Sequence, residues 1–263
     1  MPLSVDHSPL PDAAQTAARA GREPGAPVSA ATAAAKRRYV QQMFGAIAPR
    51  YDLLNRMLSL NVDRAWRRAA LAALRWRDAP SGRYLDLCAG TLDVGAMLAR
   101  QRGFTGRIVG ADFAEPMLRA GVGKAAPTVL QPVAADALTL PLRDAALDGA
   151  IVAFGIRNVA DLDAGLREVR RTLKPGARFV ILEFSTPSSA IVRAAYHAYF
   201  HHVLPAIGGL VSGHRSAYRY LPDSVAHFPS ADDLARRLEG AGFRTVSWRS
   251  LTFGIAALHV ATA

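Results

Sequence analysis

The sequence contains, at residues 147–159, the stretch LDGAIVAFGIRNV. Its apolar part, Leu147 to Ala153, predicts a buried strand, and Asp161 just beyond it could cap the start of a helix. Open α/β sheets bind their ligands beyond the carboxyl ends of the strands, which is where the polar pair Arg157-Asn158 falls. These two side chains therefore either face a ligand or cap a helix and solvate a loop.

Strands and helices alternate on both sides of this stretch. Strands are predicted over residues 84–88, 108–111, 129–134, 147–153 and 179–184, with helices over 93–100, 115–120 and 161–173. Such alternation is typical of a doubly wound α/β fold with a mostly parallel sheet. Further helices are predicted over 188–203 and 232–239, a turn over 174–176, and a polar, aromatic insertion over 214–229. The short link between strands 244–251 and 255–261 predicts a final antiparallel hairpin.

The N-terminal region differs from the rest of the chain. Residues 1–35 are rich in Ala, Pro, Ser and Gly and predict a disordered leader. Residues 36–80 carry apolar side chains at helical spacing and predict a helical cap on the domain, which spans residues 36–263. Of the net charge of +11, residues 36–83 carry +8, from eleven basic and three acidic residues. This basic region suits an anionic partner such as a membrane surface, or it is a solvated helical face.

The remaining composition limits where the protein works. Cys88 is the one cysteine, so no intrachain disulfide can form, and a reducing compartment is expected. No window of 18 apolar residues and no secretory signal core are found. We therefore expect a cytoplasmic protein whose membrane contact, at the inner face of the cytoplasmic membrane, is peripheral, and we expect no metal site.

A candidate cofactor turn follows the first strand, at residues 86–93, DLCAGTLD. Asp86, Gly90 and Thr91 lie in this turn, but its single glycine makes a weak dinucleotide motif, and no Walker lysine is present. Asp112 ends the second strand, where a carboxylate can bind ribose hydroxyls, and Asp136 with Ala137 follows the third strand, near an adenine. Each Asp could instead cap a helix or turn, but together they favour S-adenosylmethionine over NAD.

Several motifs resemble the UbiE/MenG family of quinone C-methyltransferases. The most specific are Phe154-Gly155-Ile156-Arg157-Asn158-Val159 and Tyr218-Arg219-Tyr220-Leu221-Pro222, and others run from Tyr51-Asp52-Leu53-Leu54-Asn55 to His259. The resemblance implies a class I S-adenosylmethionine-dependent methyltransferase, with a Rossmann-like, seven-stranded, mostly parallel sheet. It implies C-methylation of a prenylated quinol in menaquinone or ubiquinone biosynthesis, with demethylmenaquinol favoured. The quinol-binding candidates are Tyr51, Phe154, Arg157 and Tyr220.

One position departs from the family. Leu92 stands where the family usually has Gly, and a Leu would be strained if the turn needed a positive φ. Either the turn does not need that conformation, or cofactor affinity is compromised. We favour the first option.

The quinol becomes nucleophilic at a ring carbon when an adjacent hydroxyl is deprotonated. Arg157 could stabilise the phenolate and Asn158 could orient a quinol oxygen, while His214, His227 and Asp52 are candidate bases. Competing readings are a non-catalytic scaffold in a quinone-synthesis complex and a small-molecule O-methyltransferase. A nucleic-acid methyltransferase is disfavoured, because the Asn/Asp-Pro-Pro-aromatic motif is absent after the fourth strand. The sequence leaves open whether the protein forms a homodimer.

Overall fold

The computed structural model describes residues 33–48, 61–199 and 215–263. In these parts of the chain, the elements follow in the order α2 (Ala33–Ile47), α4 (Val62–Leu74), η3 (Trp76–Asp78), β1 (Arg83–Leu87), α5 (Asp93–Ala99), β2 (Arg107–Asp112), α6 (Glu115–Gly121), β3 (Leu130–Ala134), β4 (Leu147–Ala153), η4 (Ile156–Asn158), α7 (Leu162–Thr172), β5 (Leu173–Phe184), α8 (Ala190–Ala198), α10 (Arg215–Ala226), α11 (Ala231–Gly240), β6 (Thr245–Leu251), η6 (Thr252–Gly254) and β7 (Ala256–Thr262).

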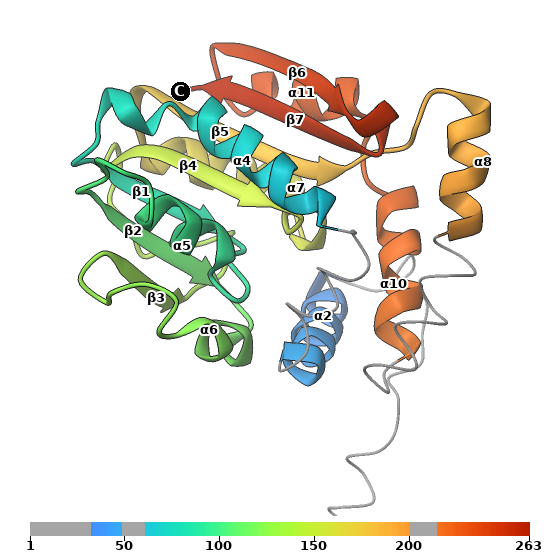
Figure 1. Ribbon diagram of the computed structural model, residues 1–263, viewed down its shortest axis with the longest axis horizontal. Coiled ribbons are helices and arrows are strands. Elements are labelled where there is room, and N and C mark those ends of the chain that lie inside the picture. The colour runs from blue at the N-terminus through green and yellow to red at the C-terminus, as the bar shows by residue number, and fades with distance from the viewer. Residues whose placement is uncertain (1–32, 49–60, 200–214) are drawn as a thin grey trace, which may run out of the picture.

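One sheet of seven strands, in the order β3-β2-β1-β4-β5-β7-β6, forms the centre of the molecule (Figure 1). β1 to β5 are parallel to their sheet neighbours within this group, and β7 is antiparallel to both β5 and β6. The predicted doubly wound sheet and C-terminal hairpin are therefore confirmed. The strand order reverses between β1 and β4, so the connections that leave these two strands diverge and open a crevice at their carboxyl ends.

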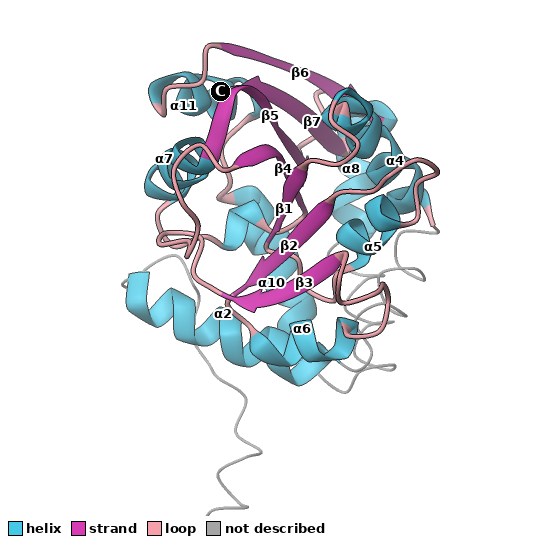
Figure 2. Cartoon of the chain, turned by 90° about the vertical axis from the view of Figure 1, so that its left-hand side faces the viewer, coloured by secondary structure: helices cyan, strands magenta, loops and turns pink. Residues whose placement is uncertain are grey.

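Helices cover both faces of the sheet (Figure 2). Successive side chains of a strand point to opposite faces, and β1 illustrates the consequence. Leu85 and Leu87 join a buried cluster with Leu166 of α7 and Leu238 of α11. Tyr84 joins the opposite cluster, which includes side chains of α4, α5 and α6. The sheet is thus buried on both sides, as its apolar strands require.

Two sequence predictions are wrong in detail. Residues 174–176 form a bulge inside β5 rather than a turn, since Leu173 already pairs with Leu147 while Arg178 pairs with Gly149. The predicted insertion over 214–229 contains a helix, α10. Its Tyr220 is buried, and the ring lies 5.8 Å from the Tyr39 ring of α2, so tertiary packing stabilises a helix that the polar sequence pattern did not reveal.

The turn between β1 and α5 does require the left-handed conformation, so our expectation for Leu92 is wrong. Leu92 has φ 64° and ψ 22°, and its side chain is 2% exposed. Glycines make room for it: a Cβ at Gly110 would lie 2.4 Å from Leu92 Cδ2, and one at Gly121 would lie 2.9 Å from its Cγ. Burying a leucine contributes about 1.5–3 kcal/mol, which offsets the roughly 1–2 kcal/mol cost of a left-handed residue.

This balance predicts that Leu92→Gly is more stable than Leu92→Ala, although glycine normally destabilises a folded chain relative to alanine. Leu92→Ala removes the packing and keeps the backbone strain, whereas Leu92→Gly removes the packing and relieves the strain. Both should lower the free energy of unfolding by about 2–5 kcal/mol, with the Gly variant about 1 kcal/mol more stable than the Ala variant. Urea unfolding measures both values, and an Ala variant equal to or more stable than the Gly variant would contradict the explanation.

Candidate functional site

A cavity opens at the carboxyl ends of β1, β2 and β4, where the strand order reverses. It is lined by Phe44, Leu87, Cys88, Gly90, Ala111, Asp112, Phe113, Met117, Ala135, Asp136, Ala137, Ala153, Phe154, Gly155, Asn158, Val159 and Ala160. Among these lining residues are two carboxylates and no lysine, arginine or histidine. The wall therefore suits a neutral or cationic ligand better than a phosphorylated one.

Asp112 fixes the glycine turn at one side of this cavity. Its Oδ2 accepts a hydrogen bond from the Gly90 N–H at 2.8 Å, and its Oδ1 accepts one from the Ala114 N–H at 2.8 Å. Gly90 has φ 52°, a conformation that a residue without Cβ adopts readily. Burial raises the pKa of Asp112, against the effect of these amide donors. With the Phe113 amide as a third donor, the carboxylate keeps acceptor capacity for a ribose hydroxyl.

Asp86 and Thr91, both predicted to bind the cofactor, are not among the residues that line the cavity. Asp86 is 2% exposed, and its Oδ2 accepts a hydrogen bond from the Gly95 N–H of α5 at 2.8 Å. Burial is the main cause that raises the pKa of Asp86 to about 7. Thr91 is also buried, and its carbonyl oxygen would lie 2.3 Å from a Cβ at Gly121. In this structure both residues support the turn, and their contact with a cofactor stays a prediction.

The loop after β3 supplies another wall. Asp136 and Ala137 line the cavity, and their contact with an adenine stays a prediction. The Asp136 Oδ1 accepts a hydrogen bond from the Leu138 N–H at 3.0 Å, which tightens the loop behind Ala137. The structure thus brings Gly90, Asp112, Asp136 and Ala137 together around one cavity.

The segment 154–158, which follows β4, forms a further part of the cavity wall. Phe154 and Asn158 line the cavity, and Tyr220 Oη of α10 donates a hydrogen bond to Asn158 Oδ1 at 2.8 Å. Desolvation raises the pKa of Tyr220 to about 12, so this hydroxyl stays protonated and keeps its donor role. Because Tyr220 occupies Oδ1, the amide nitrogen is the group that Asn158 can offer to a ligand.

Arg157 points elsewhere. Its Nη1 lies 2.6 Å from Glu183 Oε1, and the two side chains are only 6% and 2% exposed. Nη1 also donates to the Phe154 carbonyl oxygen at 2.5 Å, and Nε donates to Ser224 Oγ at 3.2 Å. Arg157 is not among the residues that line the cavity: its guanidinium forms a buried ion pair that shapes the 154–158 segment, and its contact with the substrate stays a prediction.

Comparisons with known proteins show the family of this chain. The model of the ubiE/COQ5 methyltransferase family matches residues 32–263. The chain belongs to this family. It is 50% identical over 223 residues to a demethylmenaquinone methyltransferase of Deinococcus radiodurans, a match that covers 84% of this chain and 91% of that protein. It is 46% identical over 224 residues to a ubiquinone/menaquinone biosynthesis C-methyltransferase UbiE of Geobacter sulfurreducens, covering 84% and 86%.

Among solved structures, a SAM-dependent methyltransferase of Thermotoga maritima has a similar fold. The TM-score is 0.56 at 18% identity, and the match covers 84% of this chain and 98% of that one. At this identity the likeness concerns the fold. The family match identifies the chain as a methyltransferase, as the resemblance of its motifs predicted.

The sequence analysis missed several residues of the cavity wall and its supporting contacts. Glu183, the partner of Arg157, was not singled out, although a charged residue inside an apolar strand is itself a signal. Phe44 and Phe113 also line the cavity. Phe44 belongs to α2, which is attached over the cavity by a 3.0 Å hydrogen bond from Gln41 Nε2 to the Phe113 carbonyl oxygen. No local pattern in the sequence indicates which element a helix will cover.

Three predicted site residues, Tyr51, Asp52 and His214, lie outside the described residues. The same holds for residues 1–32 of the predicted leader and residues 49–60 of the predicted helical cap. The third candidate base, His227, is exposed at the end of α10, with Nδ1 2.7 Å from the Asp223 carbonyl oxygen, and it does not line the cavity. The identity of the base therefore stays a prediction.

The buried pair predicts strong coupling between Arg157 and Glu183. Either Arg157→Met or Glu183→Leu alone leaves an uncompensated buried charge and should lower the free energy of unfolding by about 3–5 kcal/mol. The double variant should lose less than the sum, which a double-mutant cycle by urea unfolding measures. The exposed pair Arg119–Glu115 is the matched control, with expected coupling below about 1 kcal/mol. If the losses in the free energy of unfolding at Arg157 and Glu183 simply add, the two side chains are not energetically coupled and the buried ion pair is contradicted.

Proposed function

We propose that this protein transfers a methyl group from S-adenosylmethionine to a ring carbon of a prenylated quinol. The observation that carries the proposal is the cavity at the switch point, which joins the carboxylates Asp112 and Asp136 to the amide of Asn158 without a cationic side chain in its described wall. The names of the relatives support a quinone as the acceptor. Demethylmenaquinol is the favoured acceptor, because relatives at 50% and 48% identity are demethylmenaquinone methyltransferases.

The chemistry of the wall fits S-adenosylmethionine. The carboxylate of Asp112 can accept from a ribose hydroxyl, and Gly90 lets the backbone approach the ligand closely. Asp112 and Asp136 favour a ligand that carries positive charge, and a sulfonium nucleoside is one. A dinucleotide would place two phosphates against these carboxylates and is disfavoured.

When bound, S-adenosylmethionine supplies an electrophilic methyl group, and the protein contributes mainly by positioning. Asn158 can donate its amide N–H to a quinol oxygen while Tyr220 holds its Oδ1. Arg157 and Glu183 hold the Phe154 carbonyl oxygen and the start of η4, which sets the position of Asn158. Phe44 of α2 lies on the cavity wall, where it reduces access of water to the reacting groups.

The first test is the binding of S-adenosylmethionine by calorimetry to the wild type and to Asp112→Asn. The variant keeps one acceptor oxygen for the turn but loses the charge that binds the ribose, so its affinity should fall about ten-fold or more. Arg102→Gln, an exposed change before β2, is the control and should bind as the wild type does. No binding by the wild type would overturn the proposed cofactor and favour the scaffold reading.

A product assay separates the remaining alternatives. The wild type is incubated with S-adenosylmethionine and either demethylmenaquinol or a ubiquinol precursor, and the product is analysed by mass spectrometry and NMR. A methyl group on a ring carbon supports the proposal, whereas a methoxy product would identify an O-methyltransferase. Binding of the cofactor without any product would support a scaffold.

We also propose a peripheral contact with anionic membranes, from which the prenylated quinol is taken. Arg64 and Arg68 are exposed on α4. Phe253, which is 80% exposed, lies next to Thr252 in η6, and Trp66 Nε1 of α4 donates a 2.8 Å hydrogen bond to Thr252 Oγ1. Arg67, which also belongs to the basic region over residues 36–83, is buried with its Nε 3.2 Å from Asp63 Oδ2 and does not take part in the contact. Within the described residues, no helix combines the length and apolar character needed to cross a bilayer.

This contact predicts that the Arg64→Glu/Arg68→Glu variant loses binding to vesicles that contain phosphatidylglycerol, because each basic residue near an anionic surface contributes about 1 kcal/mol. Co-sedimentation measures the bound fraction. Arg102→Glu/Arg107→Glu reverses two exposed charges just before and at the start of β2, away from α4 in the sequence, and is the matched control, expected to bind like the wild type. An equal loss of vesicle binding in both variants, or no loss in the Arg64→Glu/Arg68→Glu variant, would contradict the proposed membrane contact.

A further inference from the structure

The loop that connects β3 to β4, residues 135–146, builds the cavity wall without regular secondary structure of its own. Ala135, Asp136 and Ala137 line the cavity, and Asp136 forms an isolated β-bridge with Thr139 within the loop. The ends of the loop are bonded to neighbouring backbone through the amides of Ala135, Ala145 and Ala146. A loop of this kind needs contacts from elsewhere to hold one conformation, since ordering each backbone residue costs roughly 1–2 kcal/mol.

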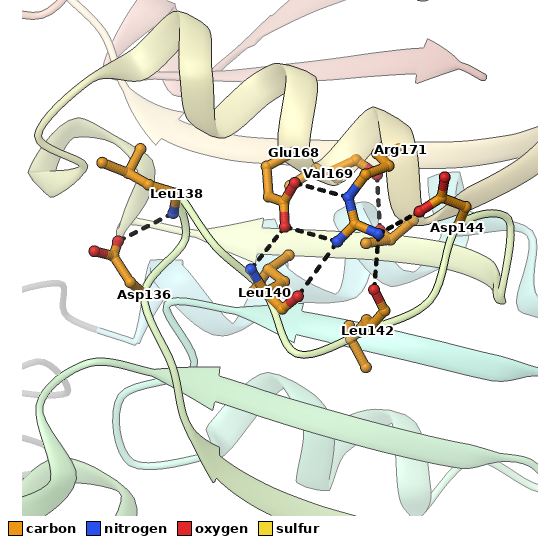
Figure 3. Close-up of polar contacts among 9 residues, drawn as sticks. Asp136, Leu138, Leu140, Leu142, Asp144, Glu168, Val169 and Arg171 are labelled. Carbon is orange, nitrogen blue, oxygen red and sulfur yellow. Dashed lines mark hydrogen bonds and ion pairs between the residues drawn. The ribbon is translucent and has the colours of Figure 1, made fainter.

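Two side chains of α7 provide such contacts (Figure 3). Arg171 donates from Nη1 to the Leu142 carbonyl oxygen at 2.8 Å and from Nη2 to the Leu140 carbonyl oxygen at 3.3 Å. Glu168 Oε1 accepts the Leu140 N–H at 2.7 Å. Three backbone groups of the loop are therefore bound by one pair of side chains.

The pair is itself well ordered. Arg171 donates to both oxygens of Glu168, from Nε at 2.8 Å and from Nη2 at 2.7 Å, and its Nη1 also contacts Asp144 Oδ1 at 2.5 Å. Such a bidentate pair fixes direction as well as distance. The hydrogen bond from Arg171 is the largest of the effects that lower the pKa of Glu168, so the carboxylate stays ionised near neutral pH.

The position of Leu140 influences the cavity wall, because only a short, closed turn separates Leu140 from Ala137. Leu140 is buried, and the Thr139 N–H donates to the Asp136 carbonyl oxygen at 3.0 Å, so the turn between them is closed. α7 also approaches this turn directly: a Cβ at Gly165 would lie 3.1 Å from Val159 and 3.9 Å from the Ala137 carbonyl oxygen. Val159 and Ala137 both line the cavity.

We propose that Glu168 and Arg171 are positioning residues for the cofactor: they hold the 135–146 loop so that Asp136 and Ala137 form the wall against the nucleoside. The inference rests on the proposed function. It assigns a role in binding to two residues that do not touch the ligand, and it places that role in the affinity for the cofactor rather than in the chemical step.

The experiment compares Arg171→Lys and Arg171→Ala with the wild type. Lysine keeps the charge and a contact with Glu168 but cannot bind both loop carbonyls and both carboxylate oxygens at once. Calorimetry should give a Kd for S-adenosylmethionine that is about ten-fold higher or more in both variants. This is the effect of losing one hydrogen bond between the displaced Asp136 carboxylate and the cofactor. The KM for the cofactor should rise with it, while kcat at saturating cofactor stays within about two-fold of the wild type.

The matched control is Arg236→Ala. Arg236 forms an ion pair with Asp233 at the same three-residue spacing, on α11, without contacting this loop. It should leave Kd and KM unchanged. Hydrogen exchange gives a second readout: the Leu138 and Leu140 amides should exchange faster in the Arg171 variants and not in the control.

Three outcomes are decisive. Raised Kd with faster exchange in the loop supports the inference. Folded Arg171 variants that bind the cofactor as the wild type does would overturn it and leave the proposed function intact. A wild type that does not bind the cofactor would overturn the proposed function and this inference together.

Discussion

The buried ion pair between Arg157 and Glu183 links the sheet to the site. Glu183 stands in β5, where its neighbours Leu182 and Val180 are fully buried, and a lone carboxylate there would be strongly destabilising. Arg157, from the segment after β4, compensates this charge and also binds Phe154 and Ser224. One interaction thus joins β5, the 154–158 segment and α10. The conformation of the cavity wall that carries Asn158 depends on it, because Phe154 and Asn158 lie on either side of Arg157 in the chain.

The need to compensate the charge of Glu183 also explains why Arg157 and Asn158, although adjacent in sequence, point to different surroundings. Arg157 turns into the protein to meet Glu183, while Asn158 meets the cavity, with Tyr220 behind it. A guanidinium cannot be deprotonated under physiological conditions, so a buried arginine requires a fixed carboxylate partner. The cavity itself is left with carboxylates and an amide, which matches a cationic nucleoside and a quinol oxygen.

Strain and support are distributed around the cofactor cavity in a similar way. Cys88, Gly90 and Leu92 all have positive φ in the turn after β1, and Phe154 has φ 63° at the start of the opposite wall. These conformations persist because the surrounding contacts determine them: Asp112 binds the Gly90 amide, and the glycines at 110 and 121 accept the Leu92 side chain. On the third wall, α7 holds a loop that has no regular structure of its own.

The sequence by itself determined the alternation of strands and helices, the doubly wound sheet, and the location of Asp112, Asp136 and Asn158 at carboxyl ends of strands. These follow from local periodicity and from the rule that parallel strands present their carboxyl ends on one edge. Only the tertiary structure decided that Arg157 pairs with Glu183, that Tyr220 sits on a helix against Asn158, and that Phe44 covers the cavity. These contacts join residues 26 or more positions apart, and Tyr220 and Asn158 are 62 apart, so no local pattern encodes them. The left-handed Leu92 belongs to the same class, since the space that makes it tolerable comes from β2 and α6.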